Sequence, residues 1–187
     1  MKQDVDEDEH SGEMQYPFIA KIIRDADRRI RVLAIMVGSI EKPTERSYGA
    51  LLAPILEDKR VFTVVSSDFC HWGNRFHYTP QPPRDDEEVN EVYEYIERLD
   101  RKGMQQIELQ RPGAFADYLK TYKNTICGRH PISVWLNALQ NQSTQSSVRF
   151  VEYAQSNKAR TAKDFSVSYA SAVCRVRRTV PADTDRA

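Results

Sequence analysis

The sequence lacks any apolar run that approaches the ~20 residues of a membrane-spanning helix. It also lacks an excess of charge of either sign, because 27 basic residues balance 27 acidic residues. That balance argues against nucleic acid and against an anionic membrane surface as the main partner. No signal peptide is visible, since the chain begins Met-Lys-Gln and then turns acidic.

Cysteine is scarce as well, with three widely spaced residues in a chain of 187. An odd number at such spacing argues against a disulfide scaffold and favours a reducing compartment such as the cytosol. The sequence has no glycine-rich phosphate loop, no G-x-S-x-G motif and no paired C-x-x-C motif. A functional site must therefore be assembled by the fold from separate segments.

The pattern of apolar residues predicts a mixed α/β fold with a core of its own. Two short apolar runs, 31–38 and 61–66, are typical of strands buried on both faces. A helix predicted over 44–57 joins them, and such a unit is right-handed and parallel by default. Further helices are predicted over 13–29, 87–104, 112–123 and 131–139, and further strands over 148–155 and 166–176.

A first group of reactive side chains follows the strand predicted over 61–66. Ligands bind beyond the carboxyl ends of strands in open α/β sheets, so Asp68 and His71 form a candidate site. Their spacing would place both on one face of a helical turn. Asp68 could then orient the imidazole, and His71 could act as base, acid or metal ligand. The alternative is that Asp68 caps a turn, His71 packs locally and Cys70 between them belongs to the core.

A second group lies in N-T-I-C-G-R-H-P, residues 124–131. Cys127 precedes a helix expected to begin at Pro131, and a helix amino-terminus with Arg129 and His130 nearby favours the thiolate. A thiolate is both a nucleophile and a soft metal ligand. The alternative is an inert buried cysteine, with His130 serving only to cap its helix.

Two further residues are candidates by their neighbours. His10 lies in the acidic stretch D-E-D-E-H-S, and Trp72 beside His71 is either an apolar anchor or part of a pocket wall. His10, Asp68, His71 and Cys127 together make a set of the kind that binds iron, copper or zinc. Only Asp68 and His71 show close ligand spacing.

Five blocks carry a resemblance to a known family. They read D-E-D-E-H-S-G-E-M, V-V-S-S-D-F-C-H-W-G-N-R-F, N-T-I-C-G-R-H-P-I, Y-A-Q-S and S-V-S-Y-A. In this order they resemble the Memo family, mediators of receptor-driven cell motility, and they span nearly the whole chain. The resemblance implies a fold similar to class III extradiol dioxygenases, with a mixed, partly parallel sheet flanked by helices. It also implies one domain over 1–176 and a disordered tail over 177–187.

The family implies a cleft that holds a redox metal, iron or copper, through two histidines and Cys127. Asp68 and His71 would belong to that cleft, with His10 nearby. Members are also described as promoting oxidant production and as binding phosphotyrosine peptides of activated receptors. Protonated His71 and Arg129 are the expected phosphate partners.

Full Memo-like proteins carry a long segment before the His10 block, which supplies both ligand histidines and several strands. We therefore expect this chain to be truncated relative to the family and to expose a sheet edge, which that segment or an oligomer would cover. Three hypotheses follow: a metal-dependent redox protein, a non-enzymatic adaptor for phosphotyrosine peptides, or an inactive fragment. The expected location is the cytoplasm, with the nucleus as a second site.

Overall fold

The computed structural model of the protein describes residues 10–26, 29–81 and 91–177. Contacts between residues divide the chain into two compact units, residues 1–39 and residues 40–187. The acidic run before His10 and most of the predicted tail, residues 178–187, lie outside the described residues. The prediction of one domain over 1–176 stays a prediction.

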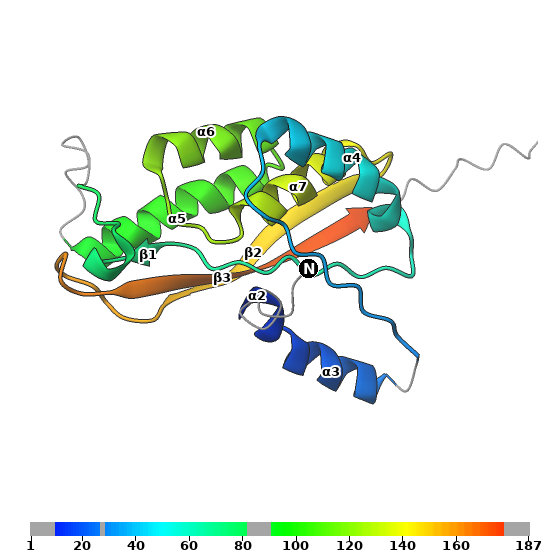
Figure 1. Ribbon diagram of the computed structural model, residues 1–187, viewed down its shortest axis with the longest axis horizontal. Coiled ribbons are helices and arrows are strands. Elements are labelled where there is room, and N and C mark those ends of the chain that lie inside the picture. Colours follow the sequence, from blue (N-terminus) through cyan, green and yellow to red (C-terminus); the bar gives the residue numbers. More distant parts are fainter. Residues whose placement is uncertain (1–9, 27–28, 82–90, 178–187) are drawn as a thin grey trace, which may run out of the picture. The chain divides into compact units, whose positions relative to one another are not determined.

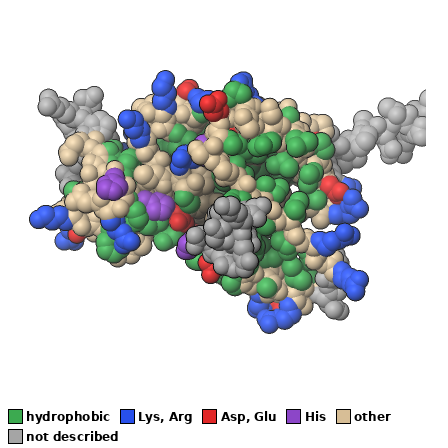
Figure 2. All heavy atoms as spheres, viewed as in Figure 1, with side chains coloured by type: hydrophobic (Ala, Val, Ile, Leu, Met, Phe, Trp, Pro, Cys, Tyr) green, Lys and Arg blue, Asp and Glu red, His purple; other side chains and the backbone are tan. Residues whose placement is uncertain are grey.

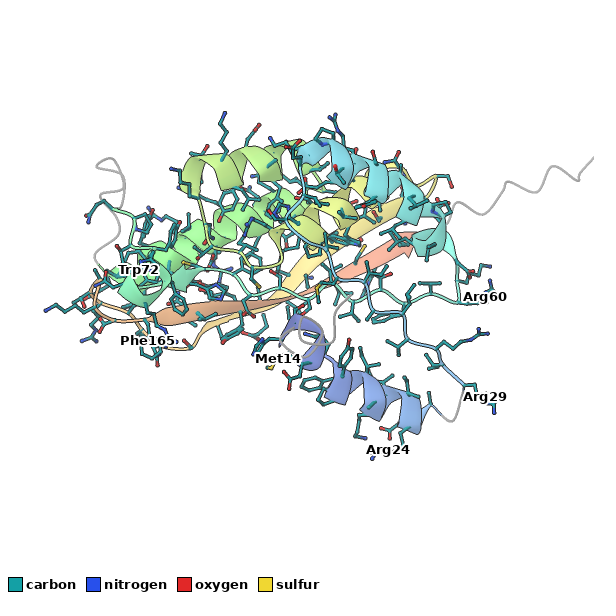
Figure 3. The ribbon with its side chains drawn as sticks, in the orientation of Figure 1. Met14, Arg24, Arg29, Arg60, Trp72 and Phe165 are labelled. Carbon is teal, nitrogen blue, oxygen red and sulfur yellow. The ribbon has the colours of Figure 1, made fainter. Side chains whose placement is uncertain are left out.

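The described residues of the first unit include two short helices, α2 (His10–Glu13) and α3 (Tyr16–Asp25) (Figure 1). Pro17 lies in the first turn of α3, where its missing N–H removes no helical hydrogen bond. Helix α3 begins at Tyr16 and ends at Asp25, so it is shorter than the helix predicted over 13–29. Met14 (Figure 3), Phe18 and Ile22 are all exposed, so the apolar residues of these helices are not covered within the unit.

The strand predicted over 31–38 is not formed. This segment has no regular secondary structure, and Leu33 and Ile35 are 79% and 57% exposed. A strand requires hydrogen bonds from its backbone to a neighbouring strand, and no described segment pairs with this one. The apolar sequence therefore indicates a surface that is suited to burial but is left open.

The second unit contains four longer helices among the described residues. They are α4 (Lys42–Glu57), α5 (Val92–Glu108), α6 (Pro112–Tyr122) and α7 (Arg129–Gln140). Figure 1 shows these helices together on one side of a long β-hairpin. Three helix predictions are confirmed within two residues at each end. For α5 the predicted start lies outside the described residues, and the helix continues four residues beyond the predicted end.

Helix α4 packs closely on α7 because a glycine stands at the contact. A Cβ on Gly49 would lie 2.5 Å from the Cβ of Asn137. The opposite side of α4 carries exposed Tyr48, Leu51 and Ile55, and Figure 2 shows hydrophobic side chains gathered over this helix. Helix α4 is therefore apolar on two sides, and one of them is uncovered.

The sheet has three strands in the order β1-β3-β2. They are β1 (His71–Trp72), β2 (Gln145–Gln155) and β3 (Ser166–Arg177), with a bulge in β2 between Phe150 and Glu152. Both pairings are antiparallel, so the described residues contain no parallel pair. The mixed α/β class is confirmed, whereas the parallel strand–helix–strand unit is not formed.

The strand predicted over 61–66 is also not formed. Residues 61–70 have no regular secondary structure before β1, and Phe62 is 88% exposed. Only the end of the segment joins the sheet, where the N–H of Phe69 donates to the carbonyl oxygen of Ser168. The apolar run leads into the sheet without pairing with it, as the segment from Arg60 to Trp72 illustrates (Figure 3).

The core of the second unit lies between the helices and the inner face of the hairpin. Its fully buried side chains include Ile96 and Leu99 of α5, Phe115 of α6 and Leu136 of α7. Phe69 and Phe150 meet edge to face, with ring centroids 5.8 Å apart. Among the described residues, no helix is both long and apolar enough to cross a membrane.

Candidate functional site

The two reactive groups meet where the segment before β1 approaches the loop before α7. The N–H of Asp68 donates to Sγ of Cys127 at 3.1 Å, and the N–H of Gly128 donates to Oγ of Ser67 at 2.9 Å. A Cβ on Gly128 would lie 2.5 Å from the Cβ of Ser67, so this approach requires glycine. Asp68 and Cys127, far apart in the sequence, are therefore neighbours.

His71 attaches to the same loop through Thr125. The N–H of His71 donates to Oγ1 of Thr125 at 2.7 Å. Nδ1 of His71 lies 3.0 Å from two carbonyl oxygens, those of Phe69 and Thr125. Carbonyl oxygens only accept hydrogen bonds, so Nδ1 carries the proton. In the neutral ring, Nε2 therefore holds the lone pair that can accept a proton or bind a metal.

Asp68 faces that free side of the imidazole. Oδ2 of Asp68 lies 3.7 Å from Nε2 of His71, which is too long for a hydrogen bond but close enough for an ion pair when the ring is protonated. The two carbonyl oxygens at Nδ1, rather than the carboxylate, therefore orient the ring. The His71 side chain is 20% exposed and that of Asp68 is 43% exposed, so the pair lies at an open surface.

The three cysteines differ in their surroundings. Cys70 is completely buried, and burial raises the pKa of its thiol. Cys174 is half-buried, and burial raises its pKa as well. Cys127 is exposed, so its alternative interpretation as an inert buried residue is wrong. The interpretation of Cys70 as a packing residue is confirmed.

A buried carboxylate lies behind the site and connects its two sides. Asp100 of α5 is fully buried and accepts hydrogen bonds from several segments. Three of the donors are the N–H of Cys70 at 3.2 Å, the amide of Asn124 at 2.7 Å and the hydroxyl of Tyr153 at 3.0 Å. Cys70 immediately precedes His71, and Asn124 begins the loop that carries the other half of the site. Asp100 therefore fixes the positions of these two segments relative to each other.

Burial raises the pKa of the Asp100 carboxyl to about 6, and its hydrogen bonds from Ser168, Asn124 and Tyr153 limit the rise. The motifs in the sequence do not point to this residue. Its signal is a single carboxylate at helical spacing from Ile96 and Ile107, on a face of α5 that is otherwise apolar. A buried acid on a helix needs partners from other segments, which its own helix does not reveal.

The other predicted residues lie elsewhere. His10 is exposed at the start of α2, in the first unit. Trp72 is 3% exposed, and its indole N–H donates to the carbonyl oxygen of Thr161, so it packs in the core; its part in a pocket wall stays a prediction. Arg129 is exposed at the start of α7, and one of its guanidinium nitrogens lies 3.4 Å from the carbonyl oxygen of Ile126.

Comparison of the sequence with known proteins identifies its family. Residues 1–173 match the family described as "Memo-like protein". The chain belongs to the Memo family. It is 45% identical over 174 residues to Protein MEMO1 of rat and to Protein MEMO1 of human, which covers 91% of this chain and 57% of each relative. It is 45% identical over 173 residues to Protein memo-1 homolog of Caenorhabditis elegans, covering 90% of this chain and 48% of that protein.

The chain thus spans about half the length of the curated Memo relatives that it matches. Among the described residues, no three His, Cys, Asp or Glu side chains converge as a metal site. Asp68, His71 and Cys127 therefore do not fit a complete iron or copper site by themselves. They lie close together at an exposed surface, with an exposed thiol, an imidazole lone pair and a carboxylate.

Proposed function

We propose that this chain is a Memo-like signalling and cell-motility factor that supplies the thiol side of a redox-metal cleft. Cys127 would be one ligand to iron or copper, and the histidine ligands would come from outside the described residues. The observation that carries the proposal is the position of Asp68, whose N–H contacts the sulfur of exposed Cys127 and whose carboxylate lies 3.7 Å from Nε2 of His71.

Each side chain has a separate role in this proposal. Thiolate sulfur prefers soft and borderline metals such as copper and iron. His71 is a second ligand or a proton shuttle, because its protonated Nδ1 leaves Nε2 directed at the open side. Asp68 lies 3.7 Å from Nε2 of His71, within the distance of an ion pair whenever that ring carries a proton. Metal-dependent oxidant production, by chemistry that resembles non-haem iron dioxygenases, is the activity that this arrangement would serve.

The proposal extends to the uncovered apolar segments. Residues 31–38 and 61–66 would each become a strand on pairing with a further segment, which would complete a partly parallel sheet of the class III extradiol dioxygenase type. Their exposed apolar side chains support this, since unpaired edges of this kind attract a partner strand. The free cysteines fit a reducing compartment, so we place the protein in the cytoplasm, with the nucleus as a second location.

Metal binding tests the first proposal. The purified chain would be dialysed anaerobically against Fe(II) and against copper, and bound metal would be measured at equilibrium. We expect Cys127→Ser to lose most of the bound metal, because it removes the thiolate. The matched control, Cys174→Ser, changes a half-buried cysteine of β3 and should retain it. Equal metal content in the two variants would refute the role of Cys127.

A second candidate function is a non-enzymatic adaptor for phosphotyrosine peptides. The favouring observation is Arg75, whose guanidinium lies 5.0 Å from the ring centroid of Phe76 and 5.1 Å from that of Phe165. The Phe76 ring in turn meets the His71 ring edge to face at 5.2 Å. An arginine fixed between two aromatic rings beside a protonatable histidine suits a phosphate on an aromatic ring. Arg129 would be the second cationic partner.

Peptide binding separates the two candidates. A tyrosine-phosphorylated peptide should bind in the presence of a chelator, and its unphosphorylated form should not. Arg75→Gln should weaken binding, whereas Arg101→Gln, which removes an arginine stacked on Tyr153 at 5.3 Å, should not. Binding that is lost with the metal would instead favour the redox cleft. A chain that binds neither metal nor peptide would correspond to the inactive fragment.

A further inference from the structure

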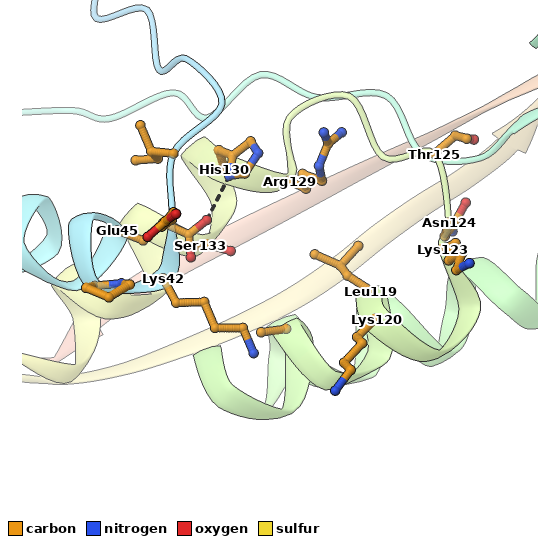
Figure 4. Close-up of a pocket in the computed structure, with 14 residues that line it drawn as sticks. Lys42, Glu45, Leu119, Lys120, Lys123, Asn124, Thr125, Arg129, His130 and Ser133 are labelled. Carbon is orange, nitrogen blue, oxygen red and sulfur yellow. Dashed lines mark hydrogen bonds and ion pairs between the residues drawn. The ribbon is translucent and has the colours of Figure 1, made fainter.

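A pocket of about 790 Å³ lies in the second unit between the start of α4, the end of α6 and the start of α7 (Figure 4). Its volume is within the range of small-molecule sites. Asp68, His71 and Cys127 are not among its lining residues. The pocket therefore excludes these three residues, although the loop before α7 that carries Cys127 also contributes Asn124 and Thr125 to its lining.

The rim of this pocket is basic. Four cationic side chains line it, from three different elements and the loop after α6: Lys42, Lys120, Lys123 and Arg129. Figure 4 shows Lys42 extending from α4 toward α6, which carries Lys120. The acidic lining residues are Glu41 and Glu45. Since Lys42 is only loosely paired with Asp117 at 3.9 Å, positive charge is in excess around the opening.

The inner part of the pocket holds polar atoms that lack partners. Nδ1 of His130 lies 2.8 Å from Oε1 of the buried Glu45. Nε2 of His130 is buried and has no hydrogen-bond partner among the described residues. Asn124, which is 4% exposed, donates its amide N–H groups to Asp100 and Tyr118, and its Oδ1 likewise has no partner in the described part of the chain. Buried polar atoms in this state indicate a missing partner.

The remaining wall is apolar and is formed by Ile40, Pro43, Ala116 and Leu119. Small-molecule sites combine such a wall with a few polar groups that fix the orientation of the ligand. We propose that this pocket binds a small organic anion, with its carboxylate or phosphate group at the basic rim and its apolar body against this wall. His130 and Asn124 also line the pocket, beside the basic side chains and the apolar wall.

The test is direct binding to the full chain by calorimetry at low salt. The probes share one body: hexanoate and hexyl phosphate carry the two anionic groups, hexanol carries no charge, and inorganic phosphate carries no body. We expect both anionic probes to bind, with hexyl phosphate the tighter because of its larger charge. Hexanol and inorganic phosphate should bind much more weakly, because hexanol lacks the anionic group and inorganic phosphate lacks the apolar body.

Charge reversal at the rim identifies the site. Lys120 is exposed, so Lys120→Glu should fold normally, and we expect it to weaken both anionic probes by about tenfold. Lys163→Glu makes the same change in an exposed loop outside the pocket and should have no effect. The proposal is refuted if hexanol binds as tightly as hexanoate, or if Lys120→Glu binds the anions as the wild type does.

Discussion

Replacing Asp100 with asparagine should make the stability of the protein less dependent on pH. The carboxyl has an ordinary pKa of 3.8, and burial raises it to about 6 in the folded chain. Between these values the unfolded chain releases a proton that the folded chain still holds. The free energy of unfolding must therefore fall as the pH rises. The contribution of this group is complete below about pH 4 and is lost as the pH rises through about 6.

The size of the effect follows from the difference between the two pKa values. From 3.8 to about 6, it corresponds to about 3 kcal/mol of unfolding free energy. Asparagine has nearly the same shape and cannot ionise, so the variant lacks this contribution at every pH. Its amide also faces the amide of Asn124, where the carboxylate accepts a hydrogen bond at 2.7 Å. That mismatch lowers stability by a constant amount, without a pH dependence.

Urea unfolding at a series of pH values from about 4 to about 7.5 would measure this difference. Every other titrating group is common to the two proteins, so subtraction isolates Asp100. We expect the wild type to lose about 2.5 kcal/mol more than Asp100→Asn across this range. Asp117→Asn is the matched control, because that carboxylate is 79% exposed. Parallel curves for the wild type and Asp100→Asn would show that the buried carboxyl does not titrate as the structure indicates.

Three other predictions concern the junction and the exposed surface. Gly128→Ala should lower stability by roughly 1–3 kcal/mol, because its Cβ would meet Ser67 at 2.5 Å; an unchanged urea midpoint would contradict the close approach. Cys127 should react fastest with a thiol reagent and Cys70 only after unfolding, as mass spectrometry of labelled peptides would reveal; simultaneous labelling would contradict their difference in burial. Phe62→Ser should reduce self-association in sedimentation, since Phe62 is 88% exposed; an unaltered profile would remove this surface from any assembly.

The helices and the hairpin of the second unit could be predicted because their signals are local. Helix α7 buries Ile132, Leu136 and Leu139 on one side, and this spacing is visible in the sequence. Proline in the first turn marks the start of α4 and α6 in the same way. For these elements the sequence pattern and the packing agree, so boundaries were correct to within two residues.

The apolar runs at 31–38 and 61–66 predict strands, but the structure forms a strand in neither segment. Apolar, β-branched sequence indicates that a segment is suited to burial, but it does not indicate which neighbour provides the burial. In this chain Leu33 and Phe62 remain exposed, and neither run has a partner strand among the described residues. The sequence pattern therefore predicts which segments are suited to burial, but it does not predict which segment covers them.

The candidate site shows a similar division. Residue type alone singled out Asp68, His71 and Cys127. Their proximity depends on the contact between Ser67 and Gly128, which no local spacing encodes. The orientation of His71 depends on two backbone carbonyl oxygens, and residue types do not predict where such oxygens lie. Asp100 was missed for the same reason, since its partners come from three other segments.

The pairing of β1 with β3 has a consequence for the order in which the protein forms. Strands β2 and β3 are joined by a short connection, so their hairpin can close early. Strand β1 instead pairs His71 with Val167, close to the end of the described chain. During synthesis the residues around His71 leave the ribosome long before their partner exists. We expect the histidine side of the cleft to be the last part to settle, and to depend on chaperones until β3 has been made.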